Sequence, residues 1–377
     1  MGSGWPTEAD CSNQRLMLTG DVKSWRILEI SEEGLFHRVA PEQTTWVWTT
    51  LRNIEKRKGD LKLKFSSRLA RELLAKIAKG EFDLIVVFAL KERLWRSDRF
   101  FLKNVSRLLK RFFWHFYTYA PYLILFIKGK SVPIVMIDQA DSTITGAQNF
   151  IFFPKTTCFF KRELPQNSWN TFLHTSRRNE DLVNIQRQSK FQKALRQLRP
   201  FPLGVHRALE FSEIRPEQKT SDIFYIGNDS RSSVRQAGIK ILERLRDQGL
   251  RVDISSQRLD VEEFRRRLSS SWLAWSPEGM GWECFRHHEA VICGTVPVIN
   301  YPTIQRYRPF IQNRHALYYG CEGDDLSQVI HEALKEKARL LEMVAAARDH
   351  LQRGYTAEAV LRYIGEEIHK TPAGEEL

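Results

Sequence analysis

Short apolar runs alternate with amphipathic helical patterns along most of this chain. In the C-terminal half, this pattern predicts strands at Ser221–Gly227, Leu250–Ser255, Ser271–Ser276 and Thr295–Asn300. Helices are predicted between them, at Val234–Gly249, at Asp260–Ser271, and in a roughly ten-residue segment that carries Arg286 and Glu289. Such regular strand–helix alternation predicts a doubly wound α/β fold with parallel sheets.

The N-terminal half shows the same pattern less clearly. An amphipathic helix is predicted at Ser66–Lys79, followed by a buried strand at Asp83–Leu90. The run Val132–Asp138 is almost wholly apolar, which is typical of a parallel strand covered on both faces. Two earlier apolar patches, at 25–30 and 44–51, are predicted to be strands or turns.

Length predicts two domains, because 377 residues exceed the size of one ordinary hydrophobic core. The best linker lies at Arg199–Ala208, which holds two prolines and a glycine, and a polar helix or loop precedes it. We therefore predict four segments: a disordered N-terminus, an N-terminal domain, a C-terminal domain, and a C-terminal helix with a tail, at 1–15, 16–200, 201–355 and 356–377.

The formal net charge of +13 favours anionic partners such as nucleotide phosphates, nucleic acid or an anionic membrane. Nucleic acid is disfavoured, because the aromatic residues lie in apolar runs rather than along an exposed basic stripe. Five scattered cysteines without a CxxC motif, and an N-terminus without a secretory pattern, are typical of a cytoplasmic protein.

Basic and aromatic residues interleave over Arg93–Lys130. The nearly uncharged run Phe112–Ile127 is too short to span a membrane and is interrupted by Pro121. Two interpretations stay open. The segment is either a buried helix pair with Arg and Lys side chains reaching solvent, or a surface that docks on the inner face of an anionic membrane.

Two glycine-containing turns follow strands in the C-terminal half. The first, Gly227 with Asn228 and Arg231, brings the backbone and a cation near the start of the next helix, where a diphosphate binds well. It lacks the GxGxxG pattern, and a strand-to-helix turn that contains Gly and Asn is usually just a turn.

The second turn, which contains Glu278, Gly279 and Gly281, leads into the helix that carries Arg286 and Glu289. Because Arg286 and Glu289 lie three residues apart, they project from the same helical face. Glu289 would accept hydrogen bonds from ribose hydroxyls, and Arg286 would stabilise charge on a departing diphosphate. The alternative is an Arg–Glu surface pair, which the two flanking apolar strands disfavour.

The run GMGWECFRHHEAVICGTVPVI resembles the donor half of exostosin-type glycosyltransferases, where a glycine turn precedes R-x-x-E-A and G-x-x-P-V-I. The resemblance extends over Asp222–Phe310, and its matching positions are Gly279, Arg286, Glu289, Ala290, Gly294, Pro297, Val298 and Ile299. A second segment, DQADSTITGAQNFIFFPKTTCFFKREL, is similar to an acceptor-half stretch of related bacterial glycosyltransferases.

This resemblance implies a GT-B architecture of two doubly wound domains, with a nucleotide sugar, most commonly a UDP-sugar, on the C-terminal one. It implies a glycan or lipid-linked glycan acceptor, no obligatory metal and no cofactor, since the nucleotide sugar is itself a substrate. Related retaining enzymes carry E-x7-E, but ten residues separate Glu278 from Glu289 here, which favours inversion. A GT-B-shaped protein that binds nucleotides or glycans without turnover is the alternative.

An inverting transfer needs a base to accept the proton of the acceptor hydroxyl. The sequence offers Asp141 first and Asp138 second, because both follow a buried strand, and also Glu163 and His115. Either aspartate could equally cap a turn. Adjacent histidines, at 287 and 288, point about 100° apart on a helix and so are not expected to share a metal ion.

Overall fold

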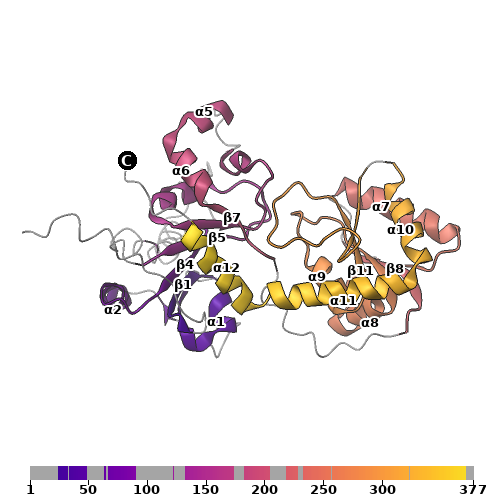
Figure 1. Ribbon diagram of the computed structural model, residues 1–377, viewed down its shortest axis with the longest axis horizontal. Coiled ribbons are helices and arrows are strands. Elements are labelled where there is room, and N and C mark those ends of the chain that lie inside the picture. The colour runs from indigo at the N-terminus through magenta and orange to yellow at the C-terminus, as the bar shows by residue number, and fades with distance from the viewer. Residues whose placement is uncertain are drawn as a thin grey trace, which may run out of the picture.

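The computed structural model contains two parallel sheets that lie in separate lobes (Figure 1). It describes residues 24–32, 34–48, 63–64, 67–90, 122, 132–173, 182–203, 218–227, 232–255, 257–321 and 323–370. The predicted disordered N-terminus at 1–15 lies outside the described residues, as does the segment 93–130 apart from Tyr122. The predicted α/β class with two doubly wound sheets is confirmed.

The N-terminal sheet has seven strands, and all neighbouring strands are parallel. In sheet order they are β3 (Leu63–Lys64), β2 (Thr44–Trp48), β1 (Ile27–Ser31), β4 (Leu84–Phe88), β5 (Ile134–Asp138), β6 (Cys158–Lys161) and β7 (Leu198–Pro200). Every residue of β1, β4, β5 and β6 is buried. Apolar side chains therefore fill both faces of the sheet, as the unbroken apolar run at β5 predicted.

The C-terminal sheet has five parallel strands. In sheet order they are β12 (Leu317–Tyr319), β11 (Val296–Asn300), β10 (Ser271–Trp275), β8 (Ser221–Ile226) and β9 (Val252–Ser255). The chain passes from β8 to β9 on one side of the sheet and then returns to β10 on the other side of β8. The loops that follow β8 and β10 therefore lead away in opposite directions at the carboxyl edge. That is where ligands bind in doubly wound sheets.

Helices cover both sheets (Figure 1). In the N-terminal domain they are α1 (Leu35–Val39), η3 (Pro41–Gln43), α2 (Ser67–Ala78), η6 (Ala147–Lys155), η7 (Ser168–Phe172), α5 (Leu182–Arg187) and α6 (Ser189–Gln197). In the C-terminal domain they are α7 (Ser233–Asp247), α8 (Val261–Ser269), α9 (Phe285–Ile292), α10 (Asp325–Lys335) and α11 (Lys337–Gly354). No helix in the described part of the chain is long and apolar enough to cross a bilayer.

Strand β7 occupies the start of the segment that the sequence indicated as a linker. The sequence indicated a linker from Arg199 onward, yet Leu198, Arg199 and Pro200 pair with β6. The explanation is that β7 is an edge strand. Proline lacks a backbone N–H, and a sheet edge tolerates this loss.

The last helix, α12 (Ala357–Lys370), returns to the N-terminal domain after α11 has crossed the C-terminal one (Figure 1). Arg199 Nε lies 2.5 Å from the carboxylate of Glu367, and Tyr363 Oη donates to the carbonyl of Pro200 at 3.0 Å. An ideal Cβ on Gly365 would lie 2.4 Å from the ring of Trp25. The N-terminal domain therefore includes the last helix of the chain. Through α11 and α12, the chain connects the two domains a second time.

Candidate functional site

Three strands of the C-terminal sheet end side by side at its carboxyl edge. Strands β8, β10 and β11 are neighbours and parallel, so the loops after Ile226, Trp275 and Asn300 start from the same edge. The predicted residues Gly227, Glu278, Gly279 and Gly281 all lie in these loops, and α9 begins shortly after them. The predicted Asn228 and Arg231 fall outside the described residues.

Arg286 reaches from α9 back to the end of β8. Its Cζ lies 5.4 Å from the centre of the Tyr225 ring, and an ideal Cβ on Gly227 would lie 3.4 Å from its Nη2. The ring of Tyr225 packs in turn on Trp275, with 4.4 Å between centroids. The guanidinium therefore has a rigid aromatic support, and Gly227 leaves the space in which it lies.

Two nitrogens of Arg286, Nε and Nη1, are buried, and no described residue accepts a hydrogen bond from them. A buried donor without an acceptor costs about 1–3 kcal/mol, and more when it is charged. Buried donors are nearly always paired, so this guanidinium calls for an acceptor that the described residues do not supply. The side chain as a whole is half-buried, and its Nη2 lies beside Gly227 at the carboxyl edge.

Residues Glu278–Glu283, which we call the glycine turn, are held from two sides. Asn300 accepts from the Glu278 amide at 2.8 Å and donates to its carboxylate, and burial raises the pKa of that carboxyl. Arg235 of α7 donates from Nε to the Glu278 carbonyl at 2.8 Å, and its Nη2 would lie 3.3 Å from a Cβ on Gly279. Arg235 is thus a second cation at this edge.

Sequence reasoning missed Arg235 and proposed Arg231 from the same loop instead. The signal was present, because Arg235 lies three residues after Ser232, whose hydroxyl caps the start of α7 by accepting from the Arg235 amide at 3.2 Å. Glu289 is half-buried on α9, three residues beyond Arg286. Its predicted contact with ribose stays a prediction.

The carboxylates suggested as bases have different surroundings. Asp138 is buried, with Lys161 Nζ at 3.1 Å, the Thr145 hydroxyl at 2.9 Å and the Ala140 amide at 3.0 Å. Its oxygens are therefore occupied by groups of its own domain. Asp141 is 40% exposed and forms an ion pair with Arg162, so it remains accessible to solvent.

Glu163 contacts the other domain. Its Oε2 accepts from the Trp282 amide at 2.8 Å and its Oε1 from the Glu283 amide at 3.2 Å, and the side chain is 1% exposed. The sequence suggested it as a base, whereas both of its oxygens here bind the backbone of the glycine turn. His115, the remaining suggestion, lies outside the described residues.

The adjacent histidines of α9 have separate surroundings. His287 lies between the Ser276 hydroxyl at 2.7 Å and the Trp282 carbonyl at 3.3 Å, and burial holds its pKa well below the usual value. His288 packs edge-on against Tyr355, and burial lowers its pKa to about 4. Both imidazoles are thus neutral at physiological pH. No group of three or more potential metal ligands occurs within the described ranges.

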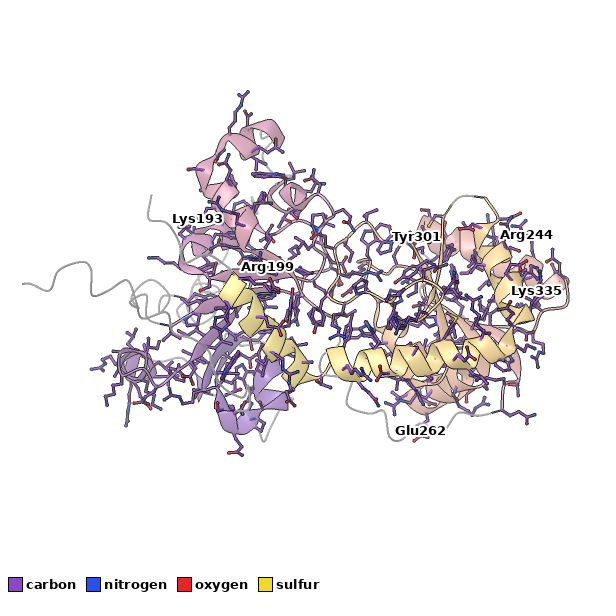
Figure 2. The ribbon with its side chains drawn as sticks, viewed as in Figure 1. Lys193, Arg199, Arg244, Glu262, Tyr301 and Lys335 are labelled. Atoms are coloured by element: carbon purple, nitrogen blue, oxygen red, sulfur yellow. The ribbon has the colours of Figure 1, made fainter. Side chains whose placement is uncertain are left out.

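An exposed aromatic side chain follows β11. Tyr301 is 56% exposed and stacks on Tyr318, with 5.3 Å between centroids and 20° between planes. Arg306 fixes Tyr318 by donating to its hydroxyl at 2.7 Å. Figure 2 shows Tyr301 between Arg199 of the N-terminal sheet and Arg244 of α7. A rigidly supported aromatic face is therefore exposed directly after the carboxyl end of β11.

No protein-family model and no curated protein sequence matches this chain. Among solved structures, it is similar to a glycosyltransferase from Rickettsia africae, with a TM-score of 0.52 and 10% sequence identity over 93% of this chain and 99% of that one. Two weaker similarities are to sucrose-phosphate synthase from Thermosynechococcus elongatus (TM-score 0.48, 13% identity, 91% and 98% covered) and to Anabaena HepE in complex with UDP (0.46, 13%, 92% and 100%).

Similarity at this level of identity concerns the fold. The Rickettsia structure is matched over nearly its whole length, so the likeness includes both sheets. Two doubly wound parallel sheets, similar as a pair to those of a glycosyltransferase, show that the chain has the GT-B fold.

Proposed function

We propose that this protein is a glycosyltransferase that uses a nucleoside diphosphate sugar, with UDP as the nucleotide. The observation that carries the proposal is Arg286, whose buried Nε and Nη1 have no hydrogen-bond acceptor among the described residues. A diphosphate at the carboxyl edge would supply those acceptors, and Arg235 lies nearby to share the charge. The HepE structure contains UDP, which agrees with this choice of nucleotide.

The chemistry follows from where charge appears during the reaction. As the bond between the sugar and the diphosphate breaks, negative charge grows on the leaving phosphate oxygen. Arg286 and Arg235 would stabilise that charge without a metal ion. Glu289 would hold the ribose, and the backbone at Gly227 and Gly279 would allow the phosphates to approach closely, whereas Glu163 occupies the space beside Gly281.

We further propose that the transfer is inverting, with a glycan or a lipid-linked glycan as acceptor, and that the protein belongs with the exostosin-type enzymes. In that scheme Asp141 accepts the proton of the acceptor hydroxyl. Its exposure and its position after β5 support this choice. Asp138 is less suited, because three groups of its own domain already bind its carboxylate.

The membrane-docking surface at 93–130 remains a proposal, since the segment lies outside the described residues apart from Tyr122. If it binds the inner face of an anionic membrane, a lipid-linked acceptor becomes the natural substrate.

A panel of nucleoside diphosphates and their sugars tests the proposed function. We expect UDP and UDP-sugars to raise the melting temperature, because a ligand at 100 times its Kd stabilises the folded state by about 2.7 kcal/mol. Sugar transfer or slow donor hydrolysis should accompany binding. Binding without any turnover would instead support the non-catalytic alternative, and a panel without any binder would contradict the proposal.

Tyr301 is expected to stack against the acceptor sugar. Its face is exposed and rigidly supported, and it precedes the segment Thr303–Gln305 that contacts the N-terminal domain. Tyr301→Ala should raise the acceptor KM about tenfold, since aromatic stacking contributes about 0.5–1.5 kcal/mol beyond burial. Tyr301→Phe should keep the wild-type value, and steady-state kinetics with each substrate varied in turn measures both. A rise in the donor KM alone would place the stacked ring on the donor instead.

A further inference from the structure

Glu163 binds across the boundary between the domains. It belongs to the turn that follows β6, and it accepts hydrogen bonds from two successive backbone amides of the glycine turn, those of Trp282 and Glu283. An ideal Cβ on Gly281 would lie only 2.5 Å from Glu163 Oε1. The carboxylate can therefore approach this backbone only because residue 281 is glycine. A carboxylate that accepts two amide hydrogens forms strong, charge-assisted bonds.

The contact continues from the glycine turn into α9. The carbonyl of Trp282 lies 3.3 Å from His287 Nε2, and His287 Nδ1 lies 2.7 Å from the hydroxyl of Ser276. Because a carbonyl can only accept, Nε2 carries the proton of the neutral ring and Nδ1 accepts from Ser276. His287 adjoins Arg286 in the same helical turn. A hydrogen-bonded path thus connects a carboxylate of one domain with the helix that carries Arg286 in the other.

The residues that follow Glu163 also hold the domains together. The Gln166 amide donates to the Thr303 carbonyl at 3.0 Å, and the Gln305 amide donates to the Leu164 carbonyl at 2.7 Å. The side-chain amide of Gln305 donates to Ser168 Oγ at 2.8 Å. This short antiparallel pairing joins the two domains directly after Glu163, and so it keeps Glu163 beside the glycine turn of the C-terminal domain.

We infer that Glu163 is a positioning residue for the donor site, which makes nucleotide binding on the C-terminal domain depend on docking of the N-terminal domain. The inference rests on the proposed function, because the donor gives the positioning its purpose. Glu163 itself touches no reacting atom. It orders the glycine turn, and through Trp282 and His287 it orders the first turn of α9. In this role both carboxylate oxygens are occupied, so Glu163 does not accept the proton of the acceptor.

The test compares the full-length protein with Glu163→Gln, which keeps the shape of the side chain but turns an NH2 group toward a backbone amide. We expect hydrogen exchange at the amides of Trp282 and Glu283 to become at least about tenfold faster. The Kd of UDP should rise about tenfold, which is a typical size for coupling between linked sites. Gly281→Ala should give the same result, because its methyl group would displace the carboxylate from the other side.

Glu243→Gln is the matched control, since Glu243 is an exposed carboxylate on α7 of the C-terminal domain, and neither quantity should change. Unchanged exchange at 282–283 in Glu163→Gln would overturn the inference, and so would an unchanged Kd for UDP. A fall in kcat with an unchanged UDP Kd would also overturn it, because that pattern belongs to a catalytic base. If UDP and the other nucleotides fail to bind the wild-type protein, the proposed function is wrong, while the exchange measurement still decides whether Glu163 holds the turn.

Discussion

Replacing Arg286 with alanine is expected to reduce sugar transfer by about 10²–10³-fold, the usual cost of removing one preorganised donor from developing negative charge. The effect should fall mainly on kcat, because the charge on the leaving diphosphate is larger in the transition state than in the bound donor. Initial rates at saturating donor and acceptor measure it. Arg286→Lys should restore only part of the rate, since an ammonium group cannot present the two N–H groups of Nε and Nη1 in one plane.

The same substitution should not destabilise the protein. Nε and Nη1 are buried without an acceptor among the described residues, so their removal breaks no hydrogen bond of theirs and ends a desolvation cost that offsets the lost packing on Tyr225. We therefore expect the melting temperature of Arg286→Ala, without ligand, to equal or exceed that of the wild type. Arg266→Ala is the control: this arginine is 54% exposed, pairs with Glu263 on α8, and should affect neither rate nor stability. A large loss of stability in Arg286→Ala with unchanged transfer would show that Arg286 is structural.

The fold was predictable from the sequence because its elements carry local signals. Apolar runs gave the buried strands β5, β8 and β11, and a serine and an aspartate begin α7 and α8 as caps, with Ser232 and Asp260 accepting from the third amide beyond them. These local signals were enough to predict where each of these strands and helices lies. The predicted segment boundaries within the chain remain predictions.

Features that depend on how a loop folds back had no such signal. Glu29 looks like a solvent-facing charge in the patch WRILEI, yet it is fully buried in β1. Its carboxylate accepts from the amides of Leu35, Phe36 and His37 and so caps α1 from a neighbouring strand. The spacing of these residues does not predict that contact, because it forms only when the loop between β1 and α1 folds back over Glu29.

The candidate site divides in the same way. Gly227, the glycine turn and Arg286 follow strand ends, so the rule that ligands gather at the carboxyl edge placed them together. Glu163 lies 119 positions before Trp282, and its role arises only when the two domains dock. In the sequence, Glu163 resembles any carboxylate after a strand, and the sequence alone therefore indicates a base.

The stability of the folded protein should depend on pH through Glu283, which lies at the boundary between the domains. This side chain is buried, its Oε2 accepts from the Leu203 amide at 3.2 Å, and burial raises the pKa of its carboxyl to about 7. Nearby Glu163 raises that pKa further, while Arg306 and Arg162 lower it. Between the usual glutamate range and pH 7, the folded protein thus holds a proton that the unfolded chain releases. The stabilisation is complete at low pH and is lost as the pH rises through 7.

Glu283→Gln should remove that loss, because glutamine copies the neutral acid and can still accept from the Leu203 amide. Between pH 5 and pH 8, the wild type should lose about 2–3 kcal/mol of unfolding free energy relative to the variant, since each pKa unit corresponds to about 1.4 kcal/mol. Urea unfolding at a series of pH values measures the difference, with Glu262→Gln, an exposed carboxylate on α8 (Figure 2), as the control. Parallel curves for wild type and Glu283→Gln would mean that Glu283 is ionised in the folded protein across this range. In that case the attraction of Arg162 and Arg306 for the carboxylate would outweigh the effect of burial on its pKa. Glu283 would then be negatively charged at the domain boundary throughout this pH range.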